Sequence, residues 1–174
     1  RVGRNDADTF RYHVVDTEDL FGHHMRHAYV KDMDVATSYA YVHQIEYNFP
    51  PTVAGSVEGL DARFRIDFAY ESRLDRMADC KGGFEEIMDK RLYEVAVHVD
   101  STRIRYYRLT YEDYDEVAKA GGFTRLEKVE RFGRDGSRYP AVFSFNYLPA
   151  TEDATVGAEL SPEFALDNVE GFFT

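Results

Sequence analysis

Three histidines within five residues, His23, His24 and His27, are the first side chains of this sequence that could hold a metal ion. On a helix, His23 and His27 would share one face and could both ligate zinc. The β-forming residues that follow, up to Val30, favour a strand instead. On a strand the same two side chains lie about 13 Å apart, which is too far for one ion. We therefore expect solvent-facing strand histidines and no metal site.

Carboxylates that could bind calcium occur at Asp6 and Asp8, and again at Glu152, Asp153 and Glu159. A calcium loop needs several oxygen ligands at fixed offsets and a glycine that turns the chain. Neither run has this spacing. The sequence predicts acidic surface at both places.

Two pairs of carboxylates could act as the acid and the base of a glycosidase, Glu85 with Glu86 and Asp61 with Asp67. The chain has 32 acidic residues, so neighbouring carboxylates are expected without any catalytic role. The Gly-x-Ser-x-Gly elbow of serine hydrolases does not occur, and the glycine pairs lack the spacing of a phosphate-binding loop. We expect no enzyme activity, no catalytic residue and no cofactor.

The single cysteine, Cys80, cannot form an intrachain disulfide. A reactive thiol needs a base and an electropositive pocket. His43 and His98 could supply a base in principle, but both lie far away in the sequence, on segments with a strand pattern. Cys80 is therefore expected to be an unpaired structural or surface residue.

Tyrosines are the remaining side chains with a functional interpretation. Tyr106, Tyr107, Tyr111 and Tyr114 could form a platform on which sugar rings stack, as in a carbohydrate-binding β-sandwich. The alternative is that they pack, because aromatic pairs across strands fix the register of a sheet. We favour packing and keep a carbohydrate-binding module as the alternative function.

The elements that must position these residues are strands. Tyr93, Val95, Val97 and Val99 alternate with other residues, and after a polar break the alternation resumes from Ile104. A period of two is typical of a half-buried strand, and two such runs joined by a short turn predict a hairpin. Similar runs occupy Phe10–Val15, Met25–Val30, Tyr39–Tyr47, Phe64–Tyr70, Leu126–Phe132 and Ala141–Tyr147.

The connections between these runs predict mainly antiparallel pairing, because most of them are short. We expect about eight to ten strands by this periodicity, in a mainly β fold that is shell-like or sandwich-like. One or two short helices are expected near residues 84–89 and 114–120, the second because Gly121 and Gly122 follow it. Residues 1–148 are expected to form one β-rich module, and residues 149–174 a linker or the start of another module.

Composition excludes some classes of function. The 174 residues carry a formal net charge of -11, and phosphate binding needs clustered basic side chains, so we expect no nucleic-acid partner. No apolar run reaches the length of a membrane span, and no secretory signal pattern is present in this sequence. The chain begins at Arg1 and we expect it to be a piece of something longer.

Several motifs, read in order, resemble one known family. They are Asp16–Val30, Tyr39–Asn48, Phe68-Ala-Tyr-Glu-Ser-Arg73, Lys90–Tyr111 and Leu126–Gly136. Their order is similar to that of the SpvB-like module of bacterial toxin-complex B components, which is related to Rhs-type shell proteins. The likeness extends over residues 10–147. The sequence departs from the pattern at His23, where the family has asparagine, and at Phe49–Pro51, where it has Gly-Asn.

This resemblance implies a scaffold. B components contribute strands to a hollow β shell that, together with a C component, encloses a toxic segment before delivery through a translocation channel. The resemblance also implies a secreted bacterial protein with a role in virulence. A related module precedes an ADP-ribosyltransferase, but the Ser-Thr-Ser and Glu-x-Glu elements of that enzyme do not occur in this sequence.

Overall fold

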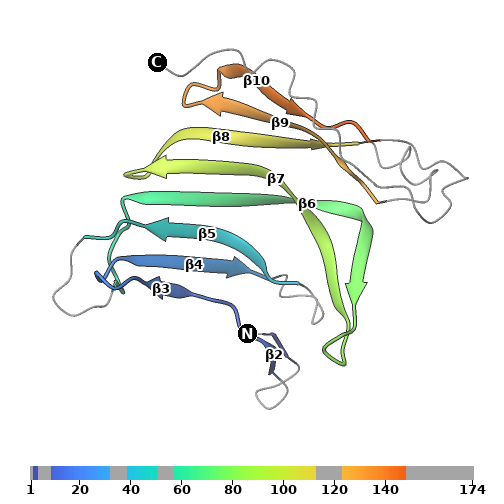
Figure 1. The fold of residues 1–174 in the computed structure, drawn as a ribbon, viewed down its shortest axis with the longest axis horizontal. Coiled ribbons are helices and arrows are strands. Elements are labelled where there is room, and N and C mark those ends of the chain that lie inside the picture. Colours follow the sequence, from blue (N-terminus) through green and yellow to red (C-terminus); the bar gives the residue numbers. More distant parts are fainter. Residues whose placement is uncertain (1, 4–8, 32–38, 51–56, 113–122, 148–174) are drawn as a thin grey trace, which may run out of the picture.

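The computed structural model describes residues 2–3, 9–31, 39–50, 57–112 and 123–147. Within these ranges the regular structure is all β (Figure 1). The strands are β1 (Val2–Gly3), β2 (Thr9–Arg11), β3 (Asp16–Glu18), β4 (His24–Val30), β5 (Tyr41–Tyr47), β6 (Phe64–Asp79), β7 (Glu86–Val99), β8 (Thr102–Tyr111), β9 (Leu126–Gly133) and β10 (Arg138–Ser144).

Eight strands form one antiparallel sheet, in which the spatial order from β3 to β10 is the order along the chain. β1 and β2 pair separately in a small two-stranded sheet. Tight turns between consecutive strands favour this order, and the β7–β8 turn is an example. Asp100 and Ser101 connect β7 to β8, and both have positive φ, 46° and 65°. Two-residue turns of this kind have the twist that joins adjacent antiparallel strands.

The sheet has one apolar and one polar face, because successive side chains of a strand point to opposite sides. Ile45, Ile66 and Val97 lie opposite one another on one face, and Glu46, Arg65 and His98 on the other. The side chains that define the apolar face are Ile45, Tyr47, Phe64, Ile66, Phe68, Val95, Val97, Val99 and Tyr107, and Arg105 and Arg131 also lie on it. The polar face carries Arg26, Glu46, Arg65, Asp67, Glu94, His98, Arg103, Arg108 and Glu130, and Ala96, Tyr106 and Phe132 lie among them.

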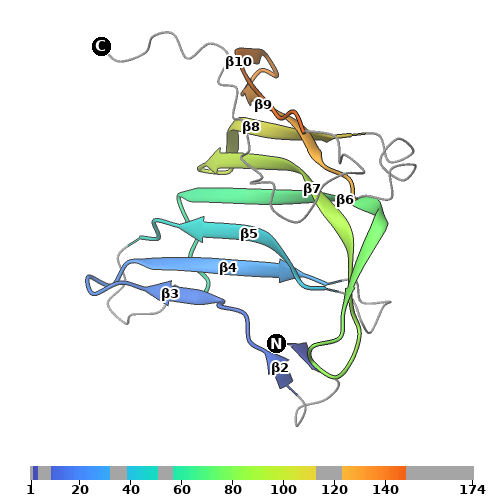
Figure 2. The same ribbon diagram turned by 45° about the vertical axis from the view of Figure 1, so that its right-hand side comes forward.

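No described element covers either face, as Figures 1 and 2 both show. All of the side chains that define the apolar face are half-buried, so each is shielded by its neighbours within the sheet. Among the described apolar residues, only Tyr41, Val57, Ala96 and Tyr106 are fully buried. The eight-stranded sheet is therefore a single layer in the described part of the chain.

The long hairpin of β6 and β7 turns a corner away from the sheet (Figures 1 and 2). Ser72 pairs with Lys90, and the next pair is Met77 with Met88. Residues 73–76 of β6 therefore stand opposite Asp89 alone. Extra residues on one strand of a pair bend that strand. The bent end lies beside β2, where the Arg11 guanidinium is 3.2 Å from the Glu86 carboxylate.

Two sequence-based expectations need correction. A helix near residues 84–89 is wrong, since Glu86 to Met88 belong to β7 and pair with Met77 to Asp79. Ladder pairing outweighs the helix-like spacing of Phe84, Ile87 and Met88. The strand expected over Phe10–Val15 is limited to Thr9–Arg11 in β2. The helix expected at residues 114–120 and the boundary near residue 148 lie outside the described residues.

The mainly β, antiparallel fold is confirmed, as are strands close to the other expected positions. Over the ranges that the structure describes, no helix of membrane-spanning length and hydropathy occurs.

Candidate functional site: a buried corner and a polar sheet face

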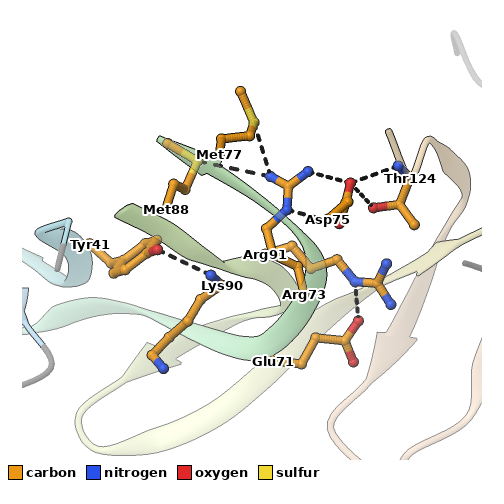
Figure 3. Close-up of polar contacts among 9 residues, drawn as sticks. All are labelled: Tyr41, Glu71, Arg73, Asp75, Met77, Met88, Lys90, Arg91 and Thr124. Atoms are coloured by element: carbon orange, nitrogen blue, oxygen red, sulfur yellow. Dashed lines mark hydrogen bonds and ion pairs between the residues drawn. The ribbon is translucent and has the colours of Figure 1, made fainter. Parts of the chain in front are cut away.

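An ion pair lies at the corner of β6, between Arg73 and Asp75 (Figure 3). Side chains two residues apart on a strand share a face, which brings these two together. Arg73 Nε donates to Asp75 Oδ1 at 3.1 Å, and Nη2 donates to Oδ2 at 2.7 Å. Only 11% and 5% of the two side chains are exposed. The geometry is the two-pronged pairing for which a guanidinium is suited.

Asp75 also holds the segment that leads into β9. Its Oδ2 accepts hydrogen bonds from the backbone N–H of Thr124 at 2.8 Å and from the Thr124 hydroxyl at 2.7 Å (Figure 3). The hydrogen bonds from Arg73, followed by those from Thr124, hold the pKa of Asp75 well below its usual range. The carboxylate therefore stays ionised and joins two parts of the chain that are about fifty residues apart, 75 and 124.

The guanidinium of Arg73 also contacts two thioethers. Its Nη1 lies 3.4 Å from Met77 Sδ and 3.9 Å from Met88 Sδ (Figure 3). Met77 and Met88 are the first pair of the ladder beyond the corner. Arg73 thus contacts both strands of the bent hairpin, and each of its three guanidinium nitrogens lies near an acceptor.

Tyr41 of β5 bonds to the backbone of β7 at the corner. Its hydroxyl accepts hydrogen bonds from the backbone N–H groups of Asp89 at 3.0 Å and of Lys90 at 3.1 Å. These groups belong to the stretch of β7 where the ladder with β6 is interrupted. Burial, the largest influence, raises the pKa of Tyr41, so the hydroxyl stays protonated. The tyrosine replaces ladder partners that the bend removes.

Arg91 of β7 connects the region of the corner to β8. Its Nε donates to Glu71 Oε1 at 2.6 Å, and its guanidinium lies 4.5 Å from the centre of the Tyr111 ring. The Tyr111 hydroxyl donates to the Leu92 carbonyl at 2.6 Å. The contacts link three strands through charge and aromatic packing. These contacts hold the three strands in position.

The polar face of the sheet carries ion pairs across and along strands. Arg26 donates to Glu46 at 2.7 Å, and Glu94 accepts from Arg108 at 3.3 Å. Arg138 donates to Glu130 at 2.8 Å, and this bond, as the largest influence, lowers the pKa of Glu130. Opposite charges on neighbouring strands stabilise a sheet modestly. This face therefore satisfies its own charges.

A hollow of about 460 Å³ lies on the polar face. Ala69 and Ala96 are short side chains among its lining residues, with Asp67 and His98 beside them. Asp67 accepts from Gln44 Nε2 at 3.2 Å and lies 3.3 Å from His98 Nδ1. That nitrogen makes no hydrogen bond to the residues that the structure describes. Burial lowers the pKa of His98. The hollow has donors and acceptors, but its described charges are largely paired with one another.

The three histidines of the opening motif do not converge on one point. His23 is exposed and its Nδ1 lies 2.8 Å from Asp19 Oδ2. His24 is buried on β4 with Nδ1 3.1 Å from Asp16 Oδ2, which corrects the expectation that it faces solvent. His27 is half-buried on the same strand, and its Nδ1 has no hydrogen-bond partner in the described structure.

The carboxylate candidates are likewise separated. Glu86 is buried beside Arg11, whereas Glu85 is exposed. Asp67 lines the hollow, and Asp61 lines a different depression. The calcium candidates Asp6, Asp8, Glu152, Asp153 and Glu159 lie outside the described residues. Within the described ranges, no three His, Cys, Asp or Glu side chains gather closely enough to hold an ion.

Cys80 is exposed in the turn between β6 and β7, in agreement with the sequence. The tyrosine platform is not an exposed row. Tyr106 is buried and stacks on Phe132, with ring centres 4.8 Å apart and planes 6° apart. Tyr107 and Tyr111 are half-buried on β8. Tyr114 lies outside the described residues.

The corner was missed at the level of sequence. Its one local signal is Arg73 followed two residues later by Asp75, a spacing that puts opposite charges on one face of a strand. Neither Thr124 nor Tyr41 can be linked to that pair without the meander. The hollow is likewise built from β5, β6, β7 and β8 and has no contiguous motif.

No protein-family model matches the sequence, and no curated protein matches it either. Solved structures do. A chain of the Photorhabdus luminescens Tc holotoxin pore is similar over 76% of this chain, with a TM-score of 0.59 and 17% identity. A chain of the TcdB2–TccC3–Cdc42 crystal structure is similar over 72%, with a TM-score of 0.53 and 16% identity.

The N-terminal domain of the effector protein SpvB from Salmonella typhimurium strain LT2 is also similar, over 64% of this chain, with a TM-score of 0.51 and 14% identity. The match spans 47% of the SpvB chain but only 8% of each of the two Tc chains. At these identities the likeness concerns the fold. The single-layer meander of this chain is thus a fold that it shares with Tc toxin components and with the N-terminal domain of SpvB.

Proposed function

We propose that this chain is a scaffold segment of a bacterial toxin-complex B component. In this role it contributes strands to a β shell that encloses a toxic effector, and it has no catalytic activity of its own. Its partners are the rest of a larger polypeptide, a C component and a translocation channel, and the assembly is secreted. The observation that carries the proposal is the single-layer meander, whose fold recurs in Tc toxin components.

The two faces of the sheet support a wall-like role. A wall needs an ordered sheet without a second layer of its own, and here neither face is covered by a described element. The polar face pairs its own charges, so it can face water. The side chains of the apolar face are only half-buried, so a neighbouring module can cover them. The bonds of Arg73, Asp75 and Tyr41 at the bend of β6 and β7 then set how the wall bends.

The test uses the complete polypeptide that carries this chain, produced together with its C component. We expect a closed particle, visible by electron microscopy, that protects the effector segment from protease. Removal of residues 9–147 should abolish that protection, since strands of the wall would be missing. A deletion variant that still closes and still protects the effector would show that the chain is not part of the wall.

A further inference from the structure

The turn between β3 and β4 is a rigid structure with an unusual sequence. The backbone N–H of Asp19 donates to the His23 carbonyl at 3.0 Å, and the N–H of Gly22 donates to the Asp19 carbonyl at 3.1 Å. Gly22 has φ of 79°, the left-handed conformation that ends a three-residue hairpin loop. The loop between these closing bonds is Leu20, Phe21 and Gly22.

The carboxylate of Asp19 fixes this loop from within. Its Oδ1 accepts the backbone N–H groups of Phe21 at 2.8 Å and of His23 at 2.9 Å, and its Oδ2 lies 2.8 Å from His23 Nδ1. The backbone bond from His23, followed by its side-chain bond, lowers the pKa of Asp19 to about 2. Aspartate commonly organises turns in this manner. The loop is thus held in one conformation.

This fixed loop presents two large apolar side chains to solvent. Leu20 is 100% exposed and Phe21 is 85% exposed. Central turn positions usually carry small or polar residues, and the hydrogen bonds above need neither a leucine nor a phenylalanine. At these exposures the two side chains bury little against the sheet, and the Phe21 ring contacts the exposed ring of His23, with centres 6.4 Å apart. Two further exposed apolar residues, Val15 and Met25, flank the same hairpin.

The charges nearby limit what can bind there. Asp16, Glu18 and Asp19 have half-exposed carboxylates next to the loop. They would repel an anionic lipid surface and attract basic side chains. Addition of another strand along β3 is disfavoured, because this edge strand has three residues and two of them are acidic. Insertion of the loop into a pocket is compatible with all of these features.

We propose that Leu20 and Phe21 form a docking knob that enters an apolar pocket with a basic rim on a neighbouring polypeptide. The inference rests on the proposed function, which supplies the assembly in which that neighbour occurs. A loop that is already ordered loses little conformational freedom on binding, so its apolar side chains contribute efficiently. An aromatic residue that fills a pocket, with charges around it, is the usual centre of such an interface.

The experiment places a photoreactive benzophenone amino acid at position 21 of the complete polypeptide, assembled with its C component. The matched control carries the same group at Arg134, an exposed residue in the turn between β9 and β10. We expect position 21 to cross-link to one peptide that contains apolar and basic residues, at a yield about tenfold above that of position 134. The yield should fall as salt is raised.

A second variant separates docking from general stickiness. Added to the protein that carries benzophenone at position 21, Asp19→Ala keeps Leu20 and the benzophenone but removes the bonds that order the loop, so the cross-link from position 21 should drop several-fold. A yield at position 21 equal to that of the control, or unaffected by Asp19→Ala, overturns the inference. So does binding of the chain to vesicles of phosphatidylcholine and phosphatidylserine that Phe21→Ser abolishes.

The outcomes for the two proposals are distinct. A closed particle without a specific cross-link from position 21 contradicts the docking knob alone. Failure to form any particle contradicts the proposed function, and the inference that rests on it fails as well.

Discussion

The hydroxyl of Tyr41 on β5 accepts the hydrogen bond that the backbone N–H of Asp89 on β7 cannot give to β6. At this point residues 73–76 of β6 stand opposite Asp89 alone, so the regular ladder is interrupted. Tyr41 is only 6% exposed, and water does not readily replace it. A side chain from a third strand therefore completes the backbone hydrogen bonding of a corner between two others.

Tyr41→Phe tests this relationship. The variant removes the hydroxyl that accepts the backbone N–H groups of Asp89 and Lys90, which we expect to lower the free energy of unfolding by about 1–3 kcal/mol. Urea denaturation measures the change. Tyr29→Phe is the matched control, because the Tyr29 hydroxyl also bonds to the backbone, where it donates to the Val14 carbonyl at an exposed position. Equal losses in the two variants would contradict the role of Tyr41.

Arg73→Ala tests the buried ion pair. It leaves the carboxylate of Asp75 buried with only Thr124 as a partner, so we expect a loss of about 3–5 kcal/mol in the free energy of unfolding. Arg125→Ala is the control. Arg125 pairs with Glu112 at 2.7 Å on the surface, where the expected loss is about 0–1 kcal/mol. A similar loss of unfolding free energy in both variants would show that burial of the Arg73–Asp75 pair adds nothing to its contribution to stability.

His98→Gln tests a pH dependence. Burial lowers the pKa of His98 below its usual 6.5, with Asp67 opposing the shift and Arg65 and Arg103 adding to it. The unfolded chain then binds a proton more readily than the folded one, so stability falls as the pH drops through about 6.5. We expect His98→Gln to lose less stability than the parent between about pH 7.5 and about pH 5.5.

Denaturation midpoints at the two pH values measure this difference. His43→Gln, at an exposed position on the rim of the same hollow, should follow the parent. If the parent and His98→Gln respond identically to acid, burial of His98 has no part in the response.

Ser101→Gly tests the β7–β8 turn. Ser101 has φ of 65°, where an L side chain is strained by about 1 kcal/mol and glycine is not. The substitution is expected to stabilise the protein by up to about 1 kcal/mol, seen as a higher melting temperature. Gly136→Ala, at φ of 81°, is the opposite case and should destabilise it. A lower melting temperature for Ser101→Gly would contradict the strain argument.

Strands were the part of this structure that the sequence predicted best. Alternation from Phe64 to Tyr70 and from Tyr93 to Val99 indicated half-buried strands, and the structure places both in the central pair of the sheet. Apolar and polar residues alternate clearly along these strands because the two faces of the sheet differ in polarity. The strand β6 continues to Asp79, but its bend interrupts the alternation after Tyr70, and the prediction ended there.

The helix expected near residues 84–89 shows the limit of local pattern. Phe84, Ile87 and Met88 have helical spacing, yet pairing of Ile87 and Met88 with Ala78 and Met77 determines the outcome. The candidate sites depended on still longer separations. The corner joins Tyr41, Asp75 and Thr124, and only the completed sheet brings them together.

The order of the strands in the sheet has a consequence for how such a chain can change in evolution. Each strand from β3 to β10 pairs only with its neighbours in the sequence. A hairpin gained or lost at the β10 end would alter the width of the sheet and break no other pairing. Lineages can therefore tune the size of the structure that this sheet contributes to by inserting or deleting whole hairpins. In that respect the domain resembles an array of repeats more than a closed globular core.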